Sequence, residues 1–420
     1  MDKLVIEGGQ KVCGSLKISG AKNGCLAMMP ASILAPGTYH FKNTPNLTDV
    51  WTMSRLLGSI GIFCELNDDE LFVDSRNINK FEAPYEHVKK MRASFYVLGP
   101  LLARWGQAKV SLPGGCAWGP RPVDLHLKGL EKLGAKIELE AGYVLAKADK
   151  LQGNRFHFDS PSVGATGNLL MAATLAKGTT QISNAAMEPE ITALARMLVK
   201  MGAKIDGIGT SIIEIEGVDS LQAVEESIIP DRIEAGTYLI AAAITQGKIE
   251  ITNVNPYHIA TVIDKLEEAG CEIDVSNDRV TLEMNDFPKP VDITTSVYPG
   301  MPTDLQAQWI SFMLQAKGTS KITETIYKDR FKHIPELARL GADVELADNV
   351  AIVNGGKRLT GAVVMSSDLR ASASLVLAAL VCEGKTEILR IYHLDRGYEK
   401  IDKKFEALGV SVKRVKTELI

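Results

Sequence analysis

The sequence lacks the features that mark several classes of protein. No apolar run approaches the roughly 18 residues of a membrane-spanning helix, and the opening segment, MDKLVIEGGQKV, lacks the basic and then apolar order of a secretory signal. The formal net charge is −4, from 47 basic and 51 acidic side chains. Because membrane surfaces and nucleic acids favour strongly basic chains, we expect neither as a partner.

Cysteine is also scarce. The six cysteines stand far apart in the 420 residues, and no two form a CxxC pair or another spacing typical of a metal site. We therefore expect free thiols, a reducing cytoplasmic compartment, and no bound metal or cofactor. Five of the thiols fall in strand or helix patterns, which favours simple packing for them, and the exception is Cys116.

Two short sequence patterns each recur six times along the chain. In both patterns a helix-like segment ends at a glycine, and a strand of alternating apolar and polar residues follows. The first set of glycines is spaced by 66 to 72 residues, and each member of the second set follows its partner by 23 to 28 residues. The first set is Gly37, Gly106, Gly178, Gly247, Gly318 and Gly384, and the second is Gly61, Gly134, Gly202, Gly270, Gly341 and Gly409. Glycine at the end of a helix adopts the left-handed conformation, which accounts for its recurrence.

Each unit of about 70 residues thus contains a helix, a strand, a second helix and further strand. The first helix of every unit, such as TYLIAAAIT, is apolar nearly all round and belongs inside the protein. The strands alternate between apolar and polar residues, so that one face is solvated. We predict an α/β fold in which sheets surround buried helices, as an inside-out barrel, with three units in each of two domains.

Polar side chains stand where each buried helix begins. Aspartate there is explained by N-capping, but cations oppose the helix dipole and point to a bound anion. Two domains with such ends facing each other would form a cationic cleft. These polar groups are Lys22, Asn23, Arg92, Ser162, Gly164, Asp231, Arg232, Asp304, Asp368 and Arg370.

The stretch SLPGGCAWGPRPVD, residues 111–124, places the exceptional thiol, Cys116, in a glycine- and proline-rich loop with Arg121 close behind. A buried packing role does not fit such a loop, because few apolar neighbours surround the thiol. Loops of this composition can close over a ligand, so we expect a lid that carries a reactive sulfur and a cation.

Several motifs together resemble the enolpyruvyl transferase family, in particular the members that act on UDP-N-acetylglucosamine. They are SGAKNG (19–24), PGGC (113–116), RPVDLH (121–126), MEPEI (187–191), PDRIEAGT (230–237), PTDLQAQ (302–308), RF (330–331), DLRASASLVLA (368–378) and IYHLDRGYE (391–399). The resemblance covers the whole chain. It implies a two-domain inverse α/β barrel, with one domain at 22–229, a second at 1–21 and 230–420, and an active site in the cleft between them.

The resemblance also implies an activity. Members move the enolpyruvyl group of phosphoenolpyruvate onto the 3′-hydroxyl of UDP-N-acetylglucosamine and release phosphate, the first committed step of peptidoglycan synthesis. By this likeness Cys116 is the proton donor and Asp304 the base for the sugar hydroxyl. Lys22, Arg121 and Arg396 grip phosphoenolpyruvate, with Asn23 beside them. Further members of the cationic cluster are Arg92, Arg330, Arg370 and the neighbouring Asp368.

For the nucleotide, the resemblance implies that the run after the thiol loop reads the uracil and that the start of a buried helix holds the diphosphate. The first group is Arg121, Pro122, Val123, Asp124 and Leu125, and the second is Ser162, Val163 and Gly164, with Ile326 as a further contact. The chain departs from the family at 159–161, where Asp-Ser-Pro stands in place of a frequent lysine.

Two alternatives remain at this point. The first is the shikimate-pathway enolpyruvyl transferase, which shares the fold and reaction but lacks the thiol loop. The second is a catalytically silent relative that binds a UDP-sugar, which would be expected to lose Cys116, Lys22 or Asp304. All three residues are present.

Overall fold

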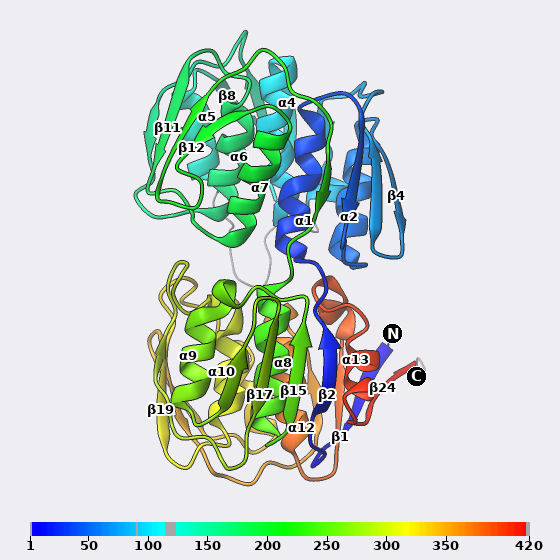
Figure 1. The fold of residues 1–420 in the computed structure, drawn as a ribbon, viewed down its shortest axis with the longest axis vertical. Helices are drawn as coiled ribbons and strands as arrows, with labels where there is room; N and C mark the ends of the chain where they lie inside the picture. The colour runs from blue at the N-terminus through cyan, green and yellow to red at the C-terminus, as the bar shows by residue number, and fades with distance from the viewer. Residues whose placement is uncertain (1, 90, 114–122, 417–420) are drawn as a thin grey trace. The chain divides into compact units, whose positions relative to one another are not determined.

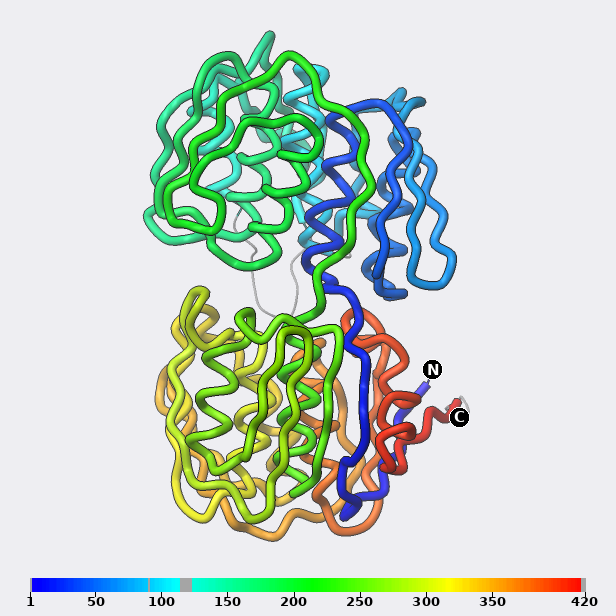
Figure 2. The backbone as a smooth tube through the Cα atoms, viewed as in Figure 1, coloured from blue at the N-terminus to red at the C-terminus, as the bar shows by residue number. Residues whose placement is uncertain are grey.

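The computed structural model describes residues 2–89, 91–113 and 123–416. The chain divides into a terminal unit, Met1–Ser19 with Pro230–Ile420, and an inserted unit, Gly20–Ile229. The division lies two residues before the position expected from the sequence. Figure 1 shows both units as mixed α/β structures. In the terminal unit the two ends of the chain lie side by side (Figure 2), since β1 (Asp2–Glu7) pairs with β24 (Val412–Lys416).

The strands in the described ranges form six four-stranded sheets with one shared topology: a parallel pair followed by two antiparallel pairings. The inserted unit contains β14 (Glu225–Ser227), β3 (Thr38–Lys42), β5 (Glu70–Asp74) and β4 (Phe63–Asn67); β6 (Glu82–Ala83), β7 (Gln107–Ser111), β9 (Tyr143–Lys147) and β8 (Lys136–Glu140); and β10 (Arg155–His157), β11 (Thr179–Ser183), β13 (Ile212–Glu216) and β12 (Lys204–Asp206).

The terminal unit contains the other three sheets, in which the same order of pairings recurs. They are β2 (Cys13–Lys17), β15 (Lys248–Thr252), β17 (Arg279–Glu283) and β16 (Glu272–Val275); β18 (Ile293–Thr294), β19 (Thr319–Thr323), β21 (Val350–Asn354) and β20 (Val344–Ala347); and β22 (Val363–Met365), β23 (Lys385–Leu389), β1 and β24. The central strands alternate as predicted: in β15, Ile249 and Ile251 are buried between polar neighbours.

The helices that are apolar all round lie inside each unit, which confirms the prediction from their composition. They are α1 (Lys22–Met28) with η1 (Met29–Ile33), η2 (Arg92–Val97) with α4 (Leu98–Trp105), α6 (Val163–Ala173), α8 (Arg232–Ile244), η4 (Thr303–Leu305) with α10 (Gln306–Met313), and α12 (Leu369–Val381). In the terminal unit α8, α10 and α12 pack against one another within the sheets (Figure 1). No helix in the described ranges has the length and apolar character needed to span a membrane.

The second helix of each unit of about 70 residues has one apolar face and lies nearer the surface. These helices are α2 (Thr48–Ser59), α5 (Asp124–Lys132), α7 (Pro189–Lys200), α9 (Ala260–Glu268), α11 (Ile334–Arg339) and α13 (Ile401–Ala407). Shorter elements are α3 (Tyr85–Val88), η3 (Pro256–Ile259) and η5 (Ile391–Arg396). The glycine after each of the six helices has a φ between 85° and 109°, so the predicted left-handed ends are confirmed for this set.

For the first set of glycines the prediction is wrong at Gly247. There the residue with positive φ is Gln246, and Gly247 is required for another reason. A Cβ atom at Gly247 would lie 2.0 Å from the carbonyl oxygen of Val12, so the position admits no side chain. The parallel pairing of β2 with β15 thus begins at a close backbone approach.

The prediction of packing for five cysteines is confirmed for Cys25, Cys271 and Cys382, which are buried free thiols. Cys64 is half-buried, and burial raises its pKa to about 12, so its thiol is unreactive. The prediction is wrong for Cys13, which opens β2 on the solvated face. Strand alternation, which single positions do not reveal, sets that exposure.

A pair of glycine substitutions tests this account of the backbone. Gly247→Ala should destabilise the protein by about 1–3 kcal/mol, because the added methyl group collides with the Val12 carbonyl. Gly58→Ala, on the exposed side of α2 with no atom near its Cβ position, should stabilise by about 0.5–1 kcal/mol. Urea denaturation of both variants measures the two shifts, and shifts of the same sign would contradict the account.

Candidate functional site

In the terminal unit, Asp304 lies between two arginines. Nη2 of Arg330 donates to Oδ1 of Asp304 at 2.6 Å, and Nη2 of Arg370 donates to Oδ2 at 2.7 Å. The guanidinium groups are almost buried, whereas the Asp304 side chain keeps 25% of its surface exposed. Asp304 is not the N-cap of η4 or α10, whose cap positions are Pro302 and Leu305. The capping explanation allowed by the sequence is therefore wrong for Asp304.

The hydroxyl of Tyr398 connects the N-terminal halves of three buried helices. Its hydroxyl lies 2.9 Å from Oγ1 of Thr237 on α8 and accepts from Nε2 of Gln308 on α10 at 3.2 Å. Nη1 of Arg370 on α12 also donates to it, at 3.4 Å. Burial raises the pKa of Tyr398, so that the hydroxyl keeps its proton and stays a neutral member of the network. The convergence of helix starts predicted from the sequence is present in this unit.

The other charged residues at these helix starts have different surroundings. Asp368 caps α12, since its Oδ1 accepts from the amides of Arg370 and Ala371 at 2.9 and 3.0 Å. Asp231 caps α8 in the same way, so capping explains both aspartates. Burial chiefly lowers the pKa of His393, and the nearby charge of Arg396 adds to that effect while Asp368 opposes it. Arg396 and Asp368 therefore lie near the same imidazole.

In the inserted unit, the predicted cations lie near buried carboxylates. Nζ of Lys22 is 3.5 Å from Oδ2 of Asp49, and both side chains are largely buried. Burial raises the pKa of Tyr96, Arg92 opposes that rise, and Glu190 and Glu188 add to it. Arg92 and the two glutamates of the MEPEI motif therefore lie near the same tyrosine.

The start of α6 combines three of the predicted residues. The hydroxyl of Tyr96 donates to the carbonyl oxygen of Val163 at 3.3 Å, and Oγ of Ser162 accepts from the amide of Ala165 at 3.3 Å. Gly164 faces the imidazole of His126, because a Cβ atom there would lie 3.1 Å from Nε2. The first residues of α6 are thus packed closely against the edge of this imidazole.

The protonation state of His126 follows from its neighbour Asn168. Oδ1 of Asn168 accepts from the amide of Gly99 at 2.7 Å, so Nδ2 is the group that lies 2.9 Å from Nδ1 of His126. Nδ1 must therefore accept, and Nε2 carries the proton on the side of Gly164. Burial, reinforced by Arg92, lowers the pKa of His126 to about 3, so the ring is neutral near pH 7.

Several predicted residues lie apart from these clusters or outside the description. Asn23 is exposed on α1, Val123 is the buried N-cap of α5, and Leu125 is half-buried. Asp124 is exposed and lies 3.8 Å from Lys128, and Ile326 is 37% exposed in the segment after β19. Cys116, Arg121 and Pro122 lie outside the described residues.

Sequence reasoning assigned no role to four residues of these networks: His126, Thr237, Gln308 and Tyr398. A signal for each was present, because they stand at or next to the last position of the motifs RPVDLH, PDRIEAGT, PTDLQAQ and IYHLDRGYE. Their hydrogen bonds join segments far apart in the chain, which motif reading along one dimension does not reveal.

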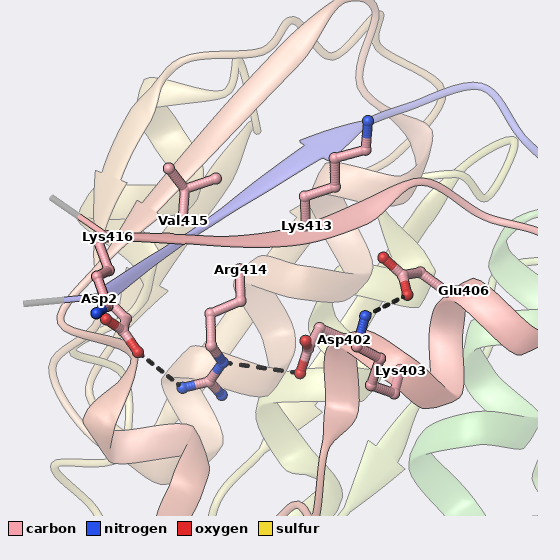
Figure 3. Close-up of a pocket in the computed structure, with 8 residues that line it drawn as sticks. All are labelled: Asp2, Asp402, Lys403, Glu406, Lys413, Arg414, Val415 and Lys416. Carbon is pink, nitrogen blue, oxygen red and sulfur yellow. Dashed lines mark hydrogen bonds and ion pairs between the residues drawn. The ribbon is translucent and has the colours of Figure 1, made fainter.

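A cavity of about 480 Å³ lies elsewhere in the terminal unit, between α13 and the strands β1 and β24 (Figure 3). Arg414 in its wall is paired with Asp395 at 2.5 Å, with Asp2 at 3.5 Å and with Asp402 at 3.7 Å. The cavity wall thus carries both acidic and basic side chains, and Arg414 is held by the acidic ones. Within residues 2–89, 91–113 and 123–416, no cluster of three or more histidine, cysteine or acidic side chains is arranged to hold a metal ion.

Known proteins resemble this chain over its whole length. The family model for EPSP synthase (3-phosphoshikimate 1-carboxyvinyltransferase) matches residues 6–405. A UDP-N-acetylglucosamine 1-carboxyvinyltransferase of Chlorobium chlorochromatii is 55% identical over 419 residues, 99% of each chain. One of Desulfosudis oleivorans is 54% identical over 415 residues, covering 99% of this chain and all of the relative.

Two solved structures share the fold. The enolpyruvyl transferase NikO from Streptomyces tendae superposes with a TM-score of 0.90 at 25% identity and covers 99% of both chains. EPSP synthase from Acinetobacter baumannii has a TM-score of 0.77 at 18% identity, with coverage of 99% of this chain and 100% of that one. The predicted mixed α/β class is confirmed by these neighbours.

The low pKa of His126 predicts a dependence of stability on pH. Below pH 6.5 the unfolded chain binds a proton at this ring that the folded protein does not, so stability falls as the pH drops from 6.5 towards 3. Replacement by glutamine (His126→Gln) should remove about 2 kcal/mol of that loss at pH 5. Urea denaturation at pH 8 and pH 5 measures this, and equal losses in the variant and the parent would contradict it.

Proposed function

The chain belongs to the EPSP synthase family of carboxyvinyltransferases, and on that premise we propose that it uses UDP-N-acetylglucosamine as its acceptor. It transfers the enolpyruvyl group of phosphoenolpyruvate to the 3′-hydroxyl of that sugar nucleotide and releases phosphate, the first committed step of peptidoglycan synthesis. The observation that carries the proposal is the 55% identity, over almost the entire chain, to a protein with that transferase name.

The reaction is an addition followed by an elimination. A proton is delivered to the methylene carbon of phosphoenolpyruvate while the sugar oxygen attacks the adjacent carbon, and phosphate then leaves as a proton is lost from the methyl group. Cys116 is the proposed acid, since a thiol with a reference pKa of ~8.5 is mostly protonated at neutral pH. Asp304 is the proposed base, because its carboxylate is oriented by two arginines and remains partly exposed.

The cations hold the anionic substrate. Lys22, Arg121 and Arg396, with Asn23, are proposed to bind phosphoenolpyruvate, because guanidinium and ammonium groups match its phosphate and carboxylate. Arg92, Arg330, Arg370 and Asp368 complete the set. Arg330 and Arg370 have a double use: each already orients Asp304, so each can stabilise charge that develops beside the reacting hydroxyl.

The nucleotide is proposed to lie along Arg121, Pro122, Val123, Asp124 and Leu125, with its uracil read by this run. The diphosphate is assigned to the start of α6, at Ser162, Val163 and Gly164, where the helix presents backbone N–H groups. These amides supply the donors in a chain that carries Asp-Ser-Pro at 159–161 instead of lysine. Ile326 is the proposed apolar contact to the nucleoside.

Architecture and location complete the proposal. The shared topology of the six sheets supports six copies of one unit of about 70 residues, three in each half of an inverse α/β barrel. Residues of both halves are proposed to serve one substrate site. We propose the cytoplasm as the location of the enzyme. We also propose that it requires neither metal nor cofactor, since the acid, the base and the cations of the reaction are all side chains.

The two alternatives are less well supported. The EPSP synthase of Acinetobacter baumannii, a shikimate-pathway transferase, is 18% identical to the chain. This similarity supports a shared fold and not a shared acceptor. A silent UDP-sugar-binding relative would have no need of the acid, the base and the phosphate-binding lysine. The chain carries Cys116, Asp304 and Lys22 together.

Phosphate release from phosphoenolpyruvate tests the acceptor. We expect release with UDP-N-acetylglucosamine and none with shikimate 3-phosphate, because the thiol loop and its RPVDLH continuation are proposed to recognise the nucleotide. A coupled colorimetric phosphate assay with each acceptor measures this. Release with shikimate 3-phosphate would overturn the proposed acceptor, and tight UDP-sugar binding without release would favour the silent relative.

Substitutions at Cys116 test the acid. Cys116→Ser should lower kcat at least about 100-fold, because an alcohol is a far weaker acid than a thiol. Cys116→Asp should retain measurable turnover, since a carboxylic acid can also deliver the proton. Steady-state kinetics of both variants provide the comparison, with Cys13→Ser as the control at an exposed thiol. Parental turnover in Cys116→Ser would remove the thiol from the mechanism.

A further inference from the structure

Glu324 is a fully buried carboxylate that follows β19 and accepts four hydrogen bonds. Its Oε1 accepts from Oγ1 of Thr295 at 2.8 Å and from the amides of Ile326 and Tyr327 at 2.7 and 2.9 Å. Its Oε2 accepts from Oγ1 of Thr303 at 2.8 Å. Every partner is a donor, so both carboxylate oxygens act as acceptors within the core.

A comparison with the other sheets indicates that the carboxylate has a task beyond folding. The corresponding residue after β3, β11 and β15 is Asn43, Asn184 or Asn253, each with a φ of 54°. The amide of each asparagine donates to the carbonyl that ends the neighbouring parallel strand, namely that of Ile228, Phe158 or Ile18, at 2.7–2.8 Å.

In the sheet of β19 a different residue closes that turn. Oγ1 of Thr325 donates to the carbonyl oxygen of Thr295 at 2.6 Å, which is the position that the asparagine amide serves elsewhere. Glu324 is therefore released from the structural task of its counterparts. A carboxylate buried at that point, where an asparagine closes the turn in three other sheets, needs a different reason, because burial of a charge is costly.

Through its Oε2 atom, Glu324 is connected by hydrogen bonds to the proposed base, Asp304. Oγ1 of Thr303 donates to Glu324 and accepts from Nη1 of Arg330 at 2.8 Å, and Nη2 of Arg330 donates to Asp304. The charges alternate along this line, from Glu324 through Arg330 and Asp304 to Arg370. Arg330 is therefore bonded directly to Asp304 and is connected to Glu324 through the Thr303 hydroxyl, so Glu324 influences how the guanidinium is directed at Asp304.

Through its Oε1 atom, Glu324 is bonded to the backbone of residues 326–327. The two amides bonded to Glu324 belong to Ile326 and Tyr327, whose side chains are 37% and 46% exposed. The buried carboxylate thus fixes a backbone turn that presents two large apolar side chains to solvent. The same group governs this turn and the orientation of Arg330.

We infer that Glu324 is a positioning residue that sets the Asp304–Arg330 pair and the 326–327 turn in one geometry, and so determines how the acceptor sugar nucleotide is used. This rests on the proposed function, in which Asp304 acts on the sugar hydroxyl and Ile326 contacts the nucleoside. Glu324 touches no reacting atom and acts through Thr303, Arg330 and the backbone.

The substitution Glu324→Gln tests the inference, because glutamine keeps the shape but replaces one acceptor oxygen with a donor. We expect kcat to fall about 10- to 100-fold, as for a lost hydrogen bond to a charged group. The KM for UDP-N-acetylglucosamine should rise about 5- to 10-fold, while the KM for phosphoenolpyruvate stays within about twofold. The matched control is Glu345→Gln, an exposed position on β20 of the same sheet, which should leave all three constants unchanged.

A second variant separates the link to Arg330 from the bonds to the backbone of residues 326–327. Thr303→Val breaks the link to Arg330 but leaves the amides of Ile326 and Tyr327 bonded to Glu324, so kcat should fall about 10-fold with little change in either KM. If Glu324 merely supports the fold, both variants would lower the thermal midpoint while the folded fraction kept the parental kcat and KM values, and that result would overturn the inference.

The same experiment distinguishes this inference from the proposed function. A parent protein that does not turn over UDP-N-acetylglucosamine defeats the proposed function. A parent that does so, together with Glu324→Gln kinetics within twofold of the parent, defeats the role of Glu324 alone. If Glu324→Gln fails to fold, the kcat of Thr303→Val decides between positioning and simple support.

Discussion

Helices that are apolar on nearly every side carry their charged groups at or near their ends, and this constraint shapes the whole protein. In each unit such helices fill the interior, and the sheets around them alternate so that their inner faces are apolar. Charged side chains cannot lie along the middle of these helices without leaving a charge in the core. They gather instead at the N-terminal ends, where unpaired N–H groups also favour an anion.

Placing cations at those ends has an electrostatic cost, because a positive charge opposes the helix dipole. Carboxylates offset that cost in both units. Asp304 lies between Arg330 and Arg370, and Lys22 lies close to Asp49.

Comparison of equivalent positions within one chain separates structural residues from specialised ones. Asparagine closes the turn after three of the strands with the same φ and the same donated hydrogen bond. The unit that contributes Asp304 departs from this pattern, with Thr325 in the structural role and Glu324 bonded to Thr303. The equivalent positions after β7 and β23 are Leu112 and Arg390, so asparagine is not required there. What distinguishes the unit of β19 is that its residue is a buried carboxylate bonded to Thr303.

The sequence determined the features that depend on local periodicity and backbone geometry: the buried helices, the alternating strands, the left-handed glycines after the outer helices and the mixed α/β class. These follow because burial and φ preference act over a few neighbouring residues. It also placed Asp304 and Arg370 at helix starts. Tertiary structure decided the rest.

What remained beyond the sequence depends on contacts between distant segments. The need for glycine at 247, the pairing of Asp304 with Arg330 and Arg370, and the hydroxyl of Tyr398 that joins three helices are examples. An aspartate at a helix start looks like a cap in one dimension. Only packing, which sets the direction of each side chain against residues tens to hundreds of positions away, distinguishes the cap Asp368 from the arginine-bound Asp304.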